Sequence, residues 1–132
     1  MIAVDTNVLL RFSIGDNAEQ GKVAKRFFEQ LVESNETAFV ASVTLAEFVW
    51  VLEKRYQVKS ADMSRALTTL LNIPNLSFEH EAAIRHAIST DGGNFSDRLI
   101  HFVGAAAGCA RTVTFDRKFA RLSGVELLEP AQ

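Results

Sequence analysis

Short apolar segments alternate along this chain with longer segments whose apolar residues recur every three or four positions. Five apolar runs bounded by polar or turn-forming residues are candidate strands: residues 2–4, 38–41, 76–78, 112–115 and 125–128. Helical spacing predicts five helices and a short sixth: residues 18–33, 42–56, 60–71, 81–88, 97–107 and 117–122. Alternating strands and helices favour parallel strand pairing. We therefore expect a single-domain α/β protein over residues 1–132, a three-layer sandwich with a mostly parallel central sheet.

The connections between these elements are polar or rich in glycine. Asp5-Thr6-Asn7 is expected to form a loop after the first strand, and residues 91–94 a second loop by composition. Asp16 and Ser96 are the predicted N-caps of the helices over 18–33 and 97–107. The second of these helices has a predicted buried stripe: Leu99, Ile100, Val103, Ala106 and Ala107.

Composition narrows the class of protein. With 132 residues, 48% of them hydrophobic, the chain can bury an apolar core without disulfides or a structural metal. The lone Cys109 favours a reducing compartment, and its glycine and alanine neighbours predict a buried position. We find no signal peptide and no apolar stretch of about 20 residues, and we expect a cytoplasmic protein without a membrane partner. The net charge of −2 argues against a protein that coats duplex nucleic acid.

Three aspartates occupy positions where α/β proteins hold ligands. Asp5 and Asp116 each follow an apolar run, so both should lie at the carboxyl edge of the sheet. A simple helix cap is the structural alternative for each residue. Asp97 opens the helix after the glycine-rich loop, where the helix dipole favours an acid in any case.

Glu47 lies inside an apolar helical segment. Its neighbours three and four positions away on the helix are mostly apolar: Val43, Thr44, Trp50 and Val51. We expect its carboxylate to be buried, and a buried carboxylate needs a metal, a cation or a proton. An ion pair with a distant arginine is the structural alternative.

Four acids are candidates for one shared pocket: Asp5, Glu47, Asp97 and Asp116. Two such charges about 4 Å apart repel by about 4 kcal/mol at an effective dielectric constant of 20, so a cluster of them requires a divalent cation. Since His80, His86 and His101 show no zinc-ligand spacing, the oxygen ligands favour Mg²⁺ or Mn²⁺. Such a pocket at a sheet edge is typical of phosphate chemistry and predicts a nuclease.

Basic residues surround Asp116 in the sequence. Four cations are candidates for contacts with RNA phosphates: Arg111, Arg117, Lys118 and Arg121. With Asp116 as the one acid between positions 111 and 121, the local charge is 4 − 1 = +3. An ordinary solvated helix face is the alternative explanation.

Four segments together resemble a known family. They are Asp5-Thr6-Asn7-Val8-Leu9-Leu10-Arg11, Leu45-Ala46-Glu47-Phe48-Val49-Trp50-Val51-Leu52, Phe95-Ser96-Asp97-Arg98-Leu99-Ile100 and Thr114-Phe115-Asp116-Arg117. In this order and at this spacing they resemble the PIN domain, specifically VapC-type toxins, over almost the whole chain.

The resemblance implies a Mg²⁺-dependent ribonuclease of a type II toxin–antitoxin pair. It implies a prokaryotic homodimer inhibited by a small antitoxin that covers or inserts into the site. The four acids would hold the metal and the attacking water, and three further residues would orient ligands or water: Thr6, Asn7 and Thr114. Many relatives have another acid where this chain has Asn94, so the number of bound metals stays open.

Other enzyme classes fit less well. A haloacid dehalogenase-type phosphatase needs an aspartate at the position of Asn7, and a receiver domain needs a phosphoacceptor near Ala41. The chain has neither a G-x-S-x-G elbow nor a glycine-rich loop ending in Gly-Lys. The remaining alternative is a catalytically silent binding module whose apolar helix over residues 45–52 meets a protein partner.

Overall fold

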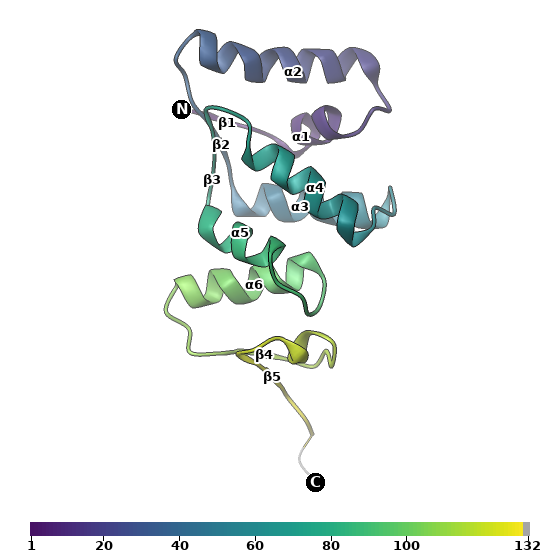
Figure 1. The fold of residues 1–132 in the computed structure, drawn as a ribbon, viewed down its shortest axis with the longest axis vertical. Helices are drawn as coiled ribbons and strands as arrows, with labels where there is room; N and C mark the ends of the chain where they lie inside the picture. The colour runs from purple at the N-terminus through teal and green to yellow at the C-terminus, as the bar shows by residue number, and fades with distance from the viewer. Residues whose placement is uncertain (131–132) are drawn as a thin grey trace. The chain divides into compact units, whose positions relative to one another are not determined.

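Strands and helices alternate along the chain as the hydrophobic pattern predicts. A computed structural model describes residues 1–130, and the chain divides into two units, Met1–Glu79 and His80–Gln132. The first unit contains β1 (Ile2–Ala3), α1 (Thr6–Ser13), α2 (Ala18–Glu33), β2 (Ala38–Val40), α3 (Ser42–Lys54), α4 (Ser60–Leu71) and β3 (Leu76–Phe78) (Figure 1). The second contains α5 (Glu81–Ile88), α6 (Phe95–Ala106), β4 (Thr112–Thr114), the 3₁₀ helix η1 (Phe119–Arg121) and β5 (Val125–Leu127).

The first unit is built on a three-stranded parallel sheet in the order β1-β2-β3. Its register places Ile2 opposite Ala38, and Ala38 opposite Leu76. Helical crossovers join successive strands, as parallel pairing requires. The core is apolar: α3 alone buries Leu45, Phe48, Val49 and Leu52.

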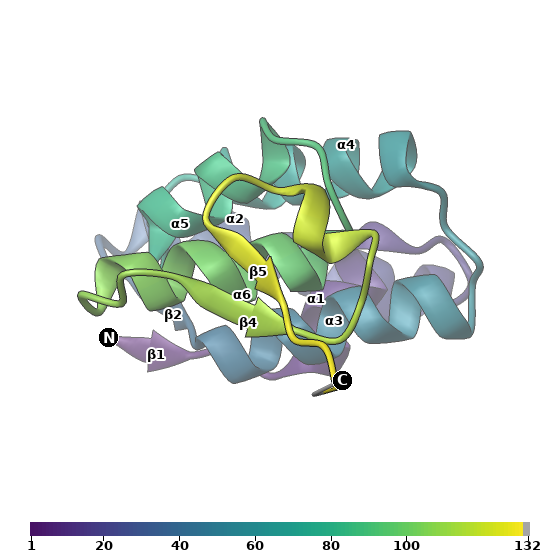
Figure 2. The ribbon, with the colours of Figure 1, turned by 90° about the horizontal axis from the view of Figure 1, so that it is seen from below.

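The second unit has a two-stranded parallel sheet of its own. Figure 2 shows β4 and β5 as neighbouring arrows, with Thr112 opposite Val125 in the register. The helices α5 and α6 pack against each other. Every strand pair within residues 1–130 is parallel, which confirms the predicted α/β class. A single domain over residues 1–132 stays a prediction.

Element bounds agree closely with the predictions where the pattern is strong, and differ at the caps. The bounds of α2, α4, β3 and α5 are those predicted. The helix α1 was not predicted. Asp5 is its N-cap, so Thr6 and Asn7 begin this helix where a polar loop was expected. Asn17, not Asp16, caps α2, and Asn94, not Ser96, caps α6. The short helix expected over residues 117–122 is a single 3₁₀ turn.

Two predictions of burial in the second unit were wrong. Of the stripe predicted on α6 only Leu99 is buried, and Ile100 is 60% exposed, because the buried face of this helix runs through Phe95, Arg98 and Leu99. Cys109 is exposed instead of buried, since α6 ends at Ala106 and the cysteine lies in the turn that follows.

Membrane insertion was not expected from the sequence. Among residues 1–130, every helix is too short or too polar to cross a bilayer.

Candidate functional site

Asp5 lies between β1 and α1, as the N-cap of α1. Its Oδ1 accepts a hydrogen bond from the backbone N–H of Thr6 at 2.7 Å. Within its unit the other carboxylate oxygen has no hydrogen-bond or ion-pair partner among the described residues, and the side chain is exposed. Thr6 is buried in the first turn of α1, and Asn7 is exposed beside it. The cap therefore fixes the Asp5 carboxylate and leaves one oxygen available.

Asp97 lies in the first turn of α6, where it forms a capping box with Asn94. The Asn94 Oδ1 accepts from the Asp97 backbone N–H at 2.8 Å, and the Asp97 Oδ2 accepts from the Asn94 backbone N–H at 3.1 Å. The preceding Gly93 has a φ of +68°, and a Cβ at this position would lie 2.8 Å from the Asp97 Oδ2. Only glycine fits here without displacing the carboxylate.

Arg98 supports this loop from inside the second unit. It is 6% exposed, and its Nε donates to the Ala87 carbonyl at 2.7 Å. Its Nη1 donates to the Gly93 carbonyl at 2.9 Å, so one guanidinium joins the end of α5 to the loop before Asp97. Arg98 was not among the predicted site residues. The pattern that could have identified it is a charged residue on the helix face that otherwise carries apolar residues such as Phe95 and Leu99.

Asp116 follows β4 and lies in the turn before η1. Its Oδ1 accepts from the backbone N–H groups of Lys118 at 2.8 Å and Phe119 at 3.2 Å. The hydroxyl of Thr114, expected to orient a ligand or water, accepts from the Asp116 backbone N–H at 3.0 Å. In this structure Thr114 therefore positions the backbone of Asp116.

The three aspartates share one arrangement. Each commits one carboxylate oxygen to backbone N–H groups at or just before the start of a helix. Among residues 1–130, the second oxygen has no partner in its unit. The capping and metal-binding interpretations are therefore compatible, since a cap holds the rotamer while the free oxygen can bind a cation. A donor set made only of carboxylate oxygens fits Mg²⁺ or Mn²⁺.

Glu47 was predicted to be buried, and that prediction was wrong. It is exposed on α3, because the arc through Leu45, Phe48 and Val49 faces the core instead. Successive helical residues point about 100° apart, so a position next to Phe48 can face outward. Glu47 has no hydrogen bond or ion pair with any described residue of its unit, which removes the ion-pair alternative there.

The four predicted acids divide between the two units. Asp5 and Glu47 belong to the first unit. Asp5 is the N-cap of α1 and Glu47 lies on α3, and these two helices pack against each other. Asp97 and Asp116 belong to the second. Over residues 1–130, neither unit by itself gathers three aspartate, glutamate, histidine or cysteine side chains in a group that could hold a metal ion. A pocket shared by all four stays a prediction.

The predicted basic residues are all exposed in the second unit. The Arg111 Nε lies 3.1 Å from the Glu126 Oε2 on β5, a partner outside the segment for which the charge of +3 was counted. Arg117, Lys118 and Arg121 lie around η1 without an ion pair in the described part of that unit. Arg117, Lys118 and Arg121 are therefore available to bind phosphates.

A cleft of about 900 Å³ lies in the first unit against β1, α1 and α2. Asp5 and Asn7 line it together with Arg11, Asn17, Glu19 and Gln20 and with apolar residues of the same elements. Arg11 was not a predicted site residue, because no helix was predicted over residues 6–13. On a helix, Asn7 and Arg11 are separated by four positions and share a face, which is the signal that could have identified it.

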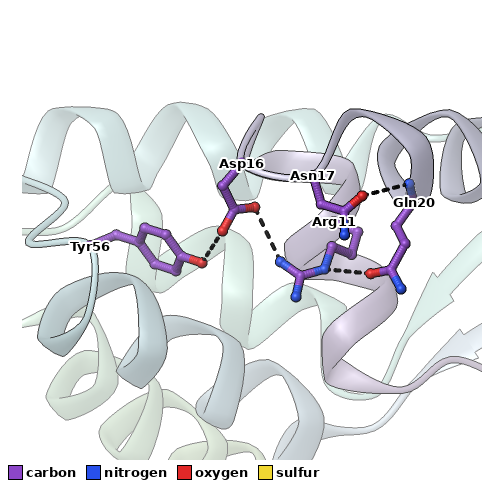
Figure 3. A network of polar contacts seen from close by, with 5 residues as sticks. All are labelled: Arg11, Asp16, Asn17, Gln20 and Tyr56. Carbon is purple, nitrogen blue, oxygen red and sulfur yellow. Dashed lines mark hydrogen bonds and ion pairs between the residues drawn. The ribbon is translucent and has the colours of Figure 1, made fainter.

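Arg11 belongs to a polar network at the start of α2 (Figure 3). Its Nε donates to the Gln20 Oε1 at 2.7 Å, and its Nη1 lies 3.1 Å from the Asp16 Oδ1. The Tyr56 hydroxyl donates to the other Asp16 oxygen at 2.6 Å. This bond, followed by the nearby Arg11 charge, holds the pKa of Asp16 below its ordinary value, and the same bond raises the pKa of Tyr56.

Known proteins match this chain over nearly its whole length. Among solved structures, VapC20 of Mycobacterium tuberculosis, described as a toxin that cleaves the sarcin–ricin loop, aligns at 20% identity with a TM-score of 0.41. That alignment covers 98% of this chain and 100% of the VapC20 chain. A search of curated proteins found no match. The model of the PIN domain family matches residues 2–125, a segment that includes all four predicted acids, and the chain therefore belongs to the PIN domain family.

Proposed function

We propose that this PIN-domain protein is a metal-dependent endoribonuclease and the toxin of a toxin–antitoxin pair. The main support is the shared arrangement of Asp5, Asp97 and Asp116, each of which has one carboxylate oxygen held by backbone N–H groups and the other without a partner in the described part of its unit. An uncompensated set of carboxylates is costly to bring together, and a divalent cation is the usual compensation. We further propose that residues 1–132 act as one nuclease domain that unites all four acids.

Carboxylate-bound Mg²⁺ or Mn²⁺ would supply activation of water and neutralisation of charge on the scissile phosphate. In the proposal Asp5, Glu47, Asp97 and Asp116 hold the ion and orient the water. Thr6 and Asn7 flank Asp5 in the first turn of α1, and Thr114 fixes the Asp116 backbone. The exposed cations of the second unit contact RNA phosphates on either side of the cleavage point.

The proposal includes the setting in which such a toxin works. We expect a cytoplasmic homodimer held inactive by a cognate antitoxin that covers or enters the site. We take the toxin role as the working assignment because four motifs of the segment that the PIN domain model matches resemble those of VapC-type toxins.

A second function is favoured by a specific observation on α3. Val43 is 76% exposed and Trp50 is 56% exposed, and both lie one helical turn from Glu47. An exposed apolar pair of this kind suits a catalytically silent module that binds a protein partner.

The experiment is cleavage of a mixed-sequence single-stranded RNA by the full chain. We expect cleavage with Mn²⁺ or Mg²⁺ and none with EDTA. Asp5→Asn and Asp97→Asn should each lower the rate by about a hundredfold or more, a change of about 2.7 kcal/mol in activation free energy. Asp62→Asn is the matched control, because Asp62 is an exposed acid on α4 that pairs with Arg65 and is not one of the four predicted acids.

The Glu47→Ala variant tests whether Glu47 is a metal ligand or a structural residue. It should abolish cleavage while the melting temperature stays constant or rises, because removing a like charge relieves repulsion. A clearly lower melting temperature would contradict the proposed role. Cleavage that continues in EDTA, or that both aspartate variants retain, would reject the metal-dependent nuclease. Absence of cleavage together with tight binding of a protein partner would support the catalytically silent module.

A further inference from the structure

The cleft of the first unit has one cationic side chain in its lining. Its charged lining residues are Asp5, Arg11 and Glu19, so Arg11 is the one basic group there among the described residues. An anionic ligand that enters this cleft meets two acids, Asp5 and Glu19, and has a single direct cationic contact available.

The guanidinium of Arg11 is held in place before any ligand arrives. Gln20 accepts from its Nε, and Asp16 accepts from its Nη1 (Figure 3). Asp16 is itself held by the Tyr56 hydroxyl from the end of α3, so the anchor is not a freely rotating side chain. An arginine has five N–H donors, and the two bonds to Gln20 and Asp16 use two of them. Further donors remain on a guanidinium whose side chain is 33% exposed.

Arg11 lies at the opposite end of α1 from Asp5. Six positions separate the two residues, which corresponds to about 9 Å along the helix axis at about 1.5 Å per residue. A nucleic-acid strand rises about 3.4 Å per nucleotide in a duplex, so a few nucleotides cover this distance. A strand that runs along α1 can therefore place one phosphate at Arg11 while another lies at the Asp5 end of the cleft.

We infer that Arg11 binds a backbone phosphate of the RNA substrate, displaced along the strand from the phosphate that is cleaved. The inference rests on the proposed nuclease function. A planar guanidinium with several donors matches the oxygens of a phosphate better than an ammonium group does. Gln20 and Asp16 act as positioning residues that fix the plane of the guanidinium.

The test measures the binding of a short fluorescein-labelled single-stranded RNA to the full chain in EDTA, where cleavage does not occur. Arg11→Gln should weaken binding about tenfold and reduce the slope of log K against log salt by about 0.7, the loss expected for one phosphate contact on a single strand. Arg26→Gln is the matched control. Arg26 lies on α2, outside the lining of the cleft, and forms an exposed pair with Glu33. The affinity of this control should therefore stay within about twofold of the parent, and its salt slope should stay unchanged.

Two further variants keep the test valid if Arg11→Gln disturbs folding. Arg11→Lys keeps the positive charge and should retain most of the salt slope while losing affinity. Gln20→Glu keeps an acceptor for the Arg11 Nε but adds a negative charge beside it, so RNA affinity should fall with no loss of helical content by circular dichroism. Unchanged affinity and slope in Arg11→Gln and Gln20→Glu would overturn the inference.

The outcomes separate this inference from the proposed function. Metal-dependent cleavage by the parent together with normal RNA binding by Arg11→Gln would reject only the role of Arg11. A parent that neither binds nor cleaves RNA would reject both.

Discussion

The two units are stabilised in different ways. In Met1–Glu79, the largest fully buried side chains are apolar and come from every helix of the unit: Leu9, Leu31, Leu45, Phe48, Leu52, Leu67 and Leu70. In His80–Gln132, the corresponding core is smaller, with Ile84 as its one large fully buried side chain among the described residues. It also contains a buried arginine, whose guanidinium donates to two backbone carbonyls.

This difference extends to the predicted acids. In the second unit, Asp97 and Asp116 are fixed by reciprocal backbone bonds, by Gly93 and by Thr114. In the first unit, Asp5 has a single cap bond, and Glu47 depends on the packing of α3 alone. Fewer polar contacts therefore position the acids of the first unit than those of the second.

The largest expected effect comes from the apolar core. Phe48→Ala should lower the free energy of unfolding by about 3–5 kcal/mol, because Phe48 is fully buried in α3 and its removal leaves a cavity. Urea denaturation followed by circular dichroism measures the change. Val32→Ala, at a position of α2 that is 52% exposed, is the control and should change stability by at most about 0.5 kcal/mol. A loss below about 1 kcal/mol for Phe48→Ala would show that the first unit does not depend on this core.

The next effect tests the polar contacts of the second unit. Arg98→Met should cost about 2–3 kcal/mol, because it removes charged donors from the carbonyls of Ala87 and Gly93. Native-state hydrogen exchange should show faster exchange at residues 89–98 and little change in the first unit.

The control for this variant is Arg85→Met, on α5 of the same unit. Arg85 forms an exposed pair with Glu81, so its loss should cost under about 1 kcal/mol. Equal effects of the two variants would contradict a special role for the buried guanidinium.

The smallest effect concerns the hydrogen bond between Tyr56 and Asp16. The lowered pKa of Asp16 stabilises the fold above its ordinary value of 3.8, and this contribution is lost as the pH falls through the lowered value. The raised pKa of Tyr56 stabilises the fold below its ordinary value of 10.0, and that contribution is lost as the pH rises through the raised value. Tyr56→Phe should therefore lower stability by a constant amount between about pH 4 and pH 10 and by less outside this window.

Urea denaturation at a series of pH values measures this profile. Because the network is exposed, the loss should be smaller than for Phe48→Ala and Arg98→Met. A stability difference that does not depend on pH would indicate that Tyr56 acts through packing and not through Asp16.

The sequence predicted the elements whose signal is local. The apolar spacing over residues 18–33, 60–71 and 81–88 gave α2, α4 and α5 with their observed bounds, since helical periodicity depends on neighbours three and four positions away. It missed α1 because Asp5, Thr6 and Asn7 resemble a loop by composition, although an aspartate followed by an apolar run is also an N-cap signal. The buried position predicted for Glu47 was wrong because an apolar segment does not specify which arc of its helix meets the core.

By itself, the sequence determined the α/β class, most of the helices and the identities of the candidate acids, because these depend on periodicity and on residue type. Only the tertiary structure revealed that Arg98 is buried against two carbonyls, and that Tyr56 reaches Asp16 across 40 positions of sequence to hold Arg11 beside the cleft. Such contacts join residues that the local pattern leaves unrelated, and the packing of whole helices creates them.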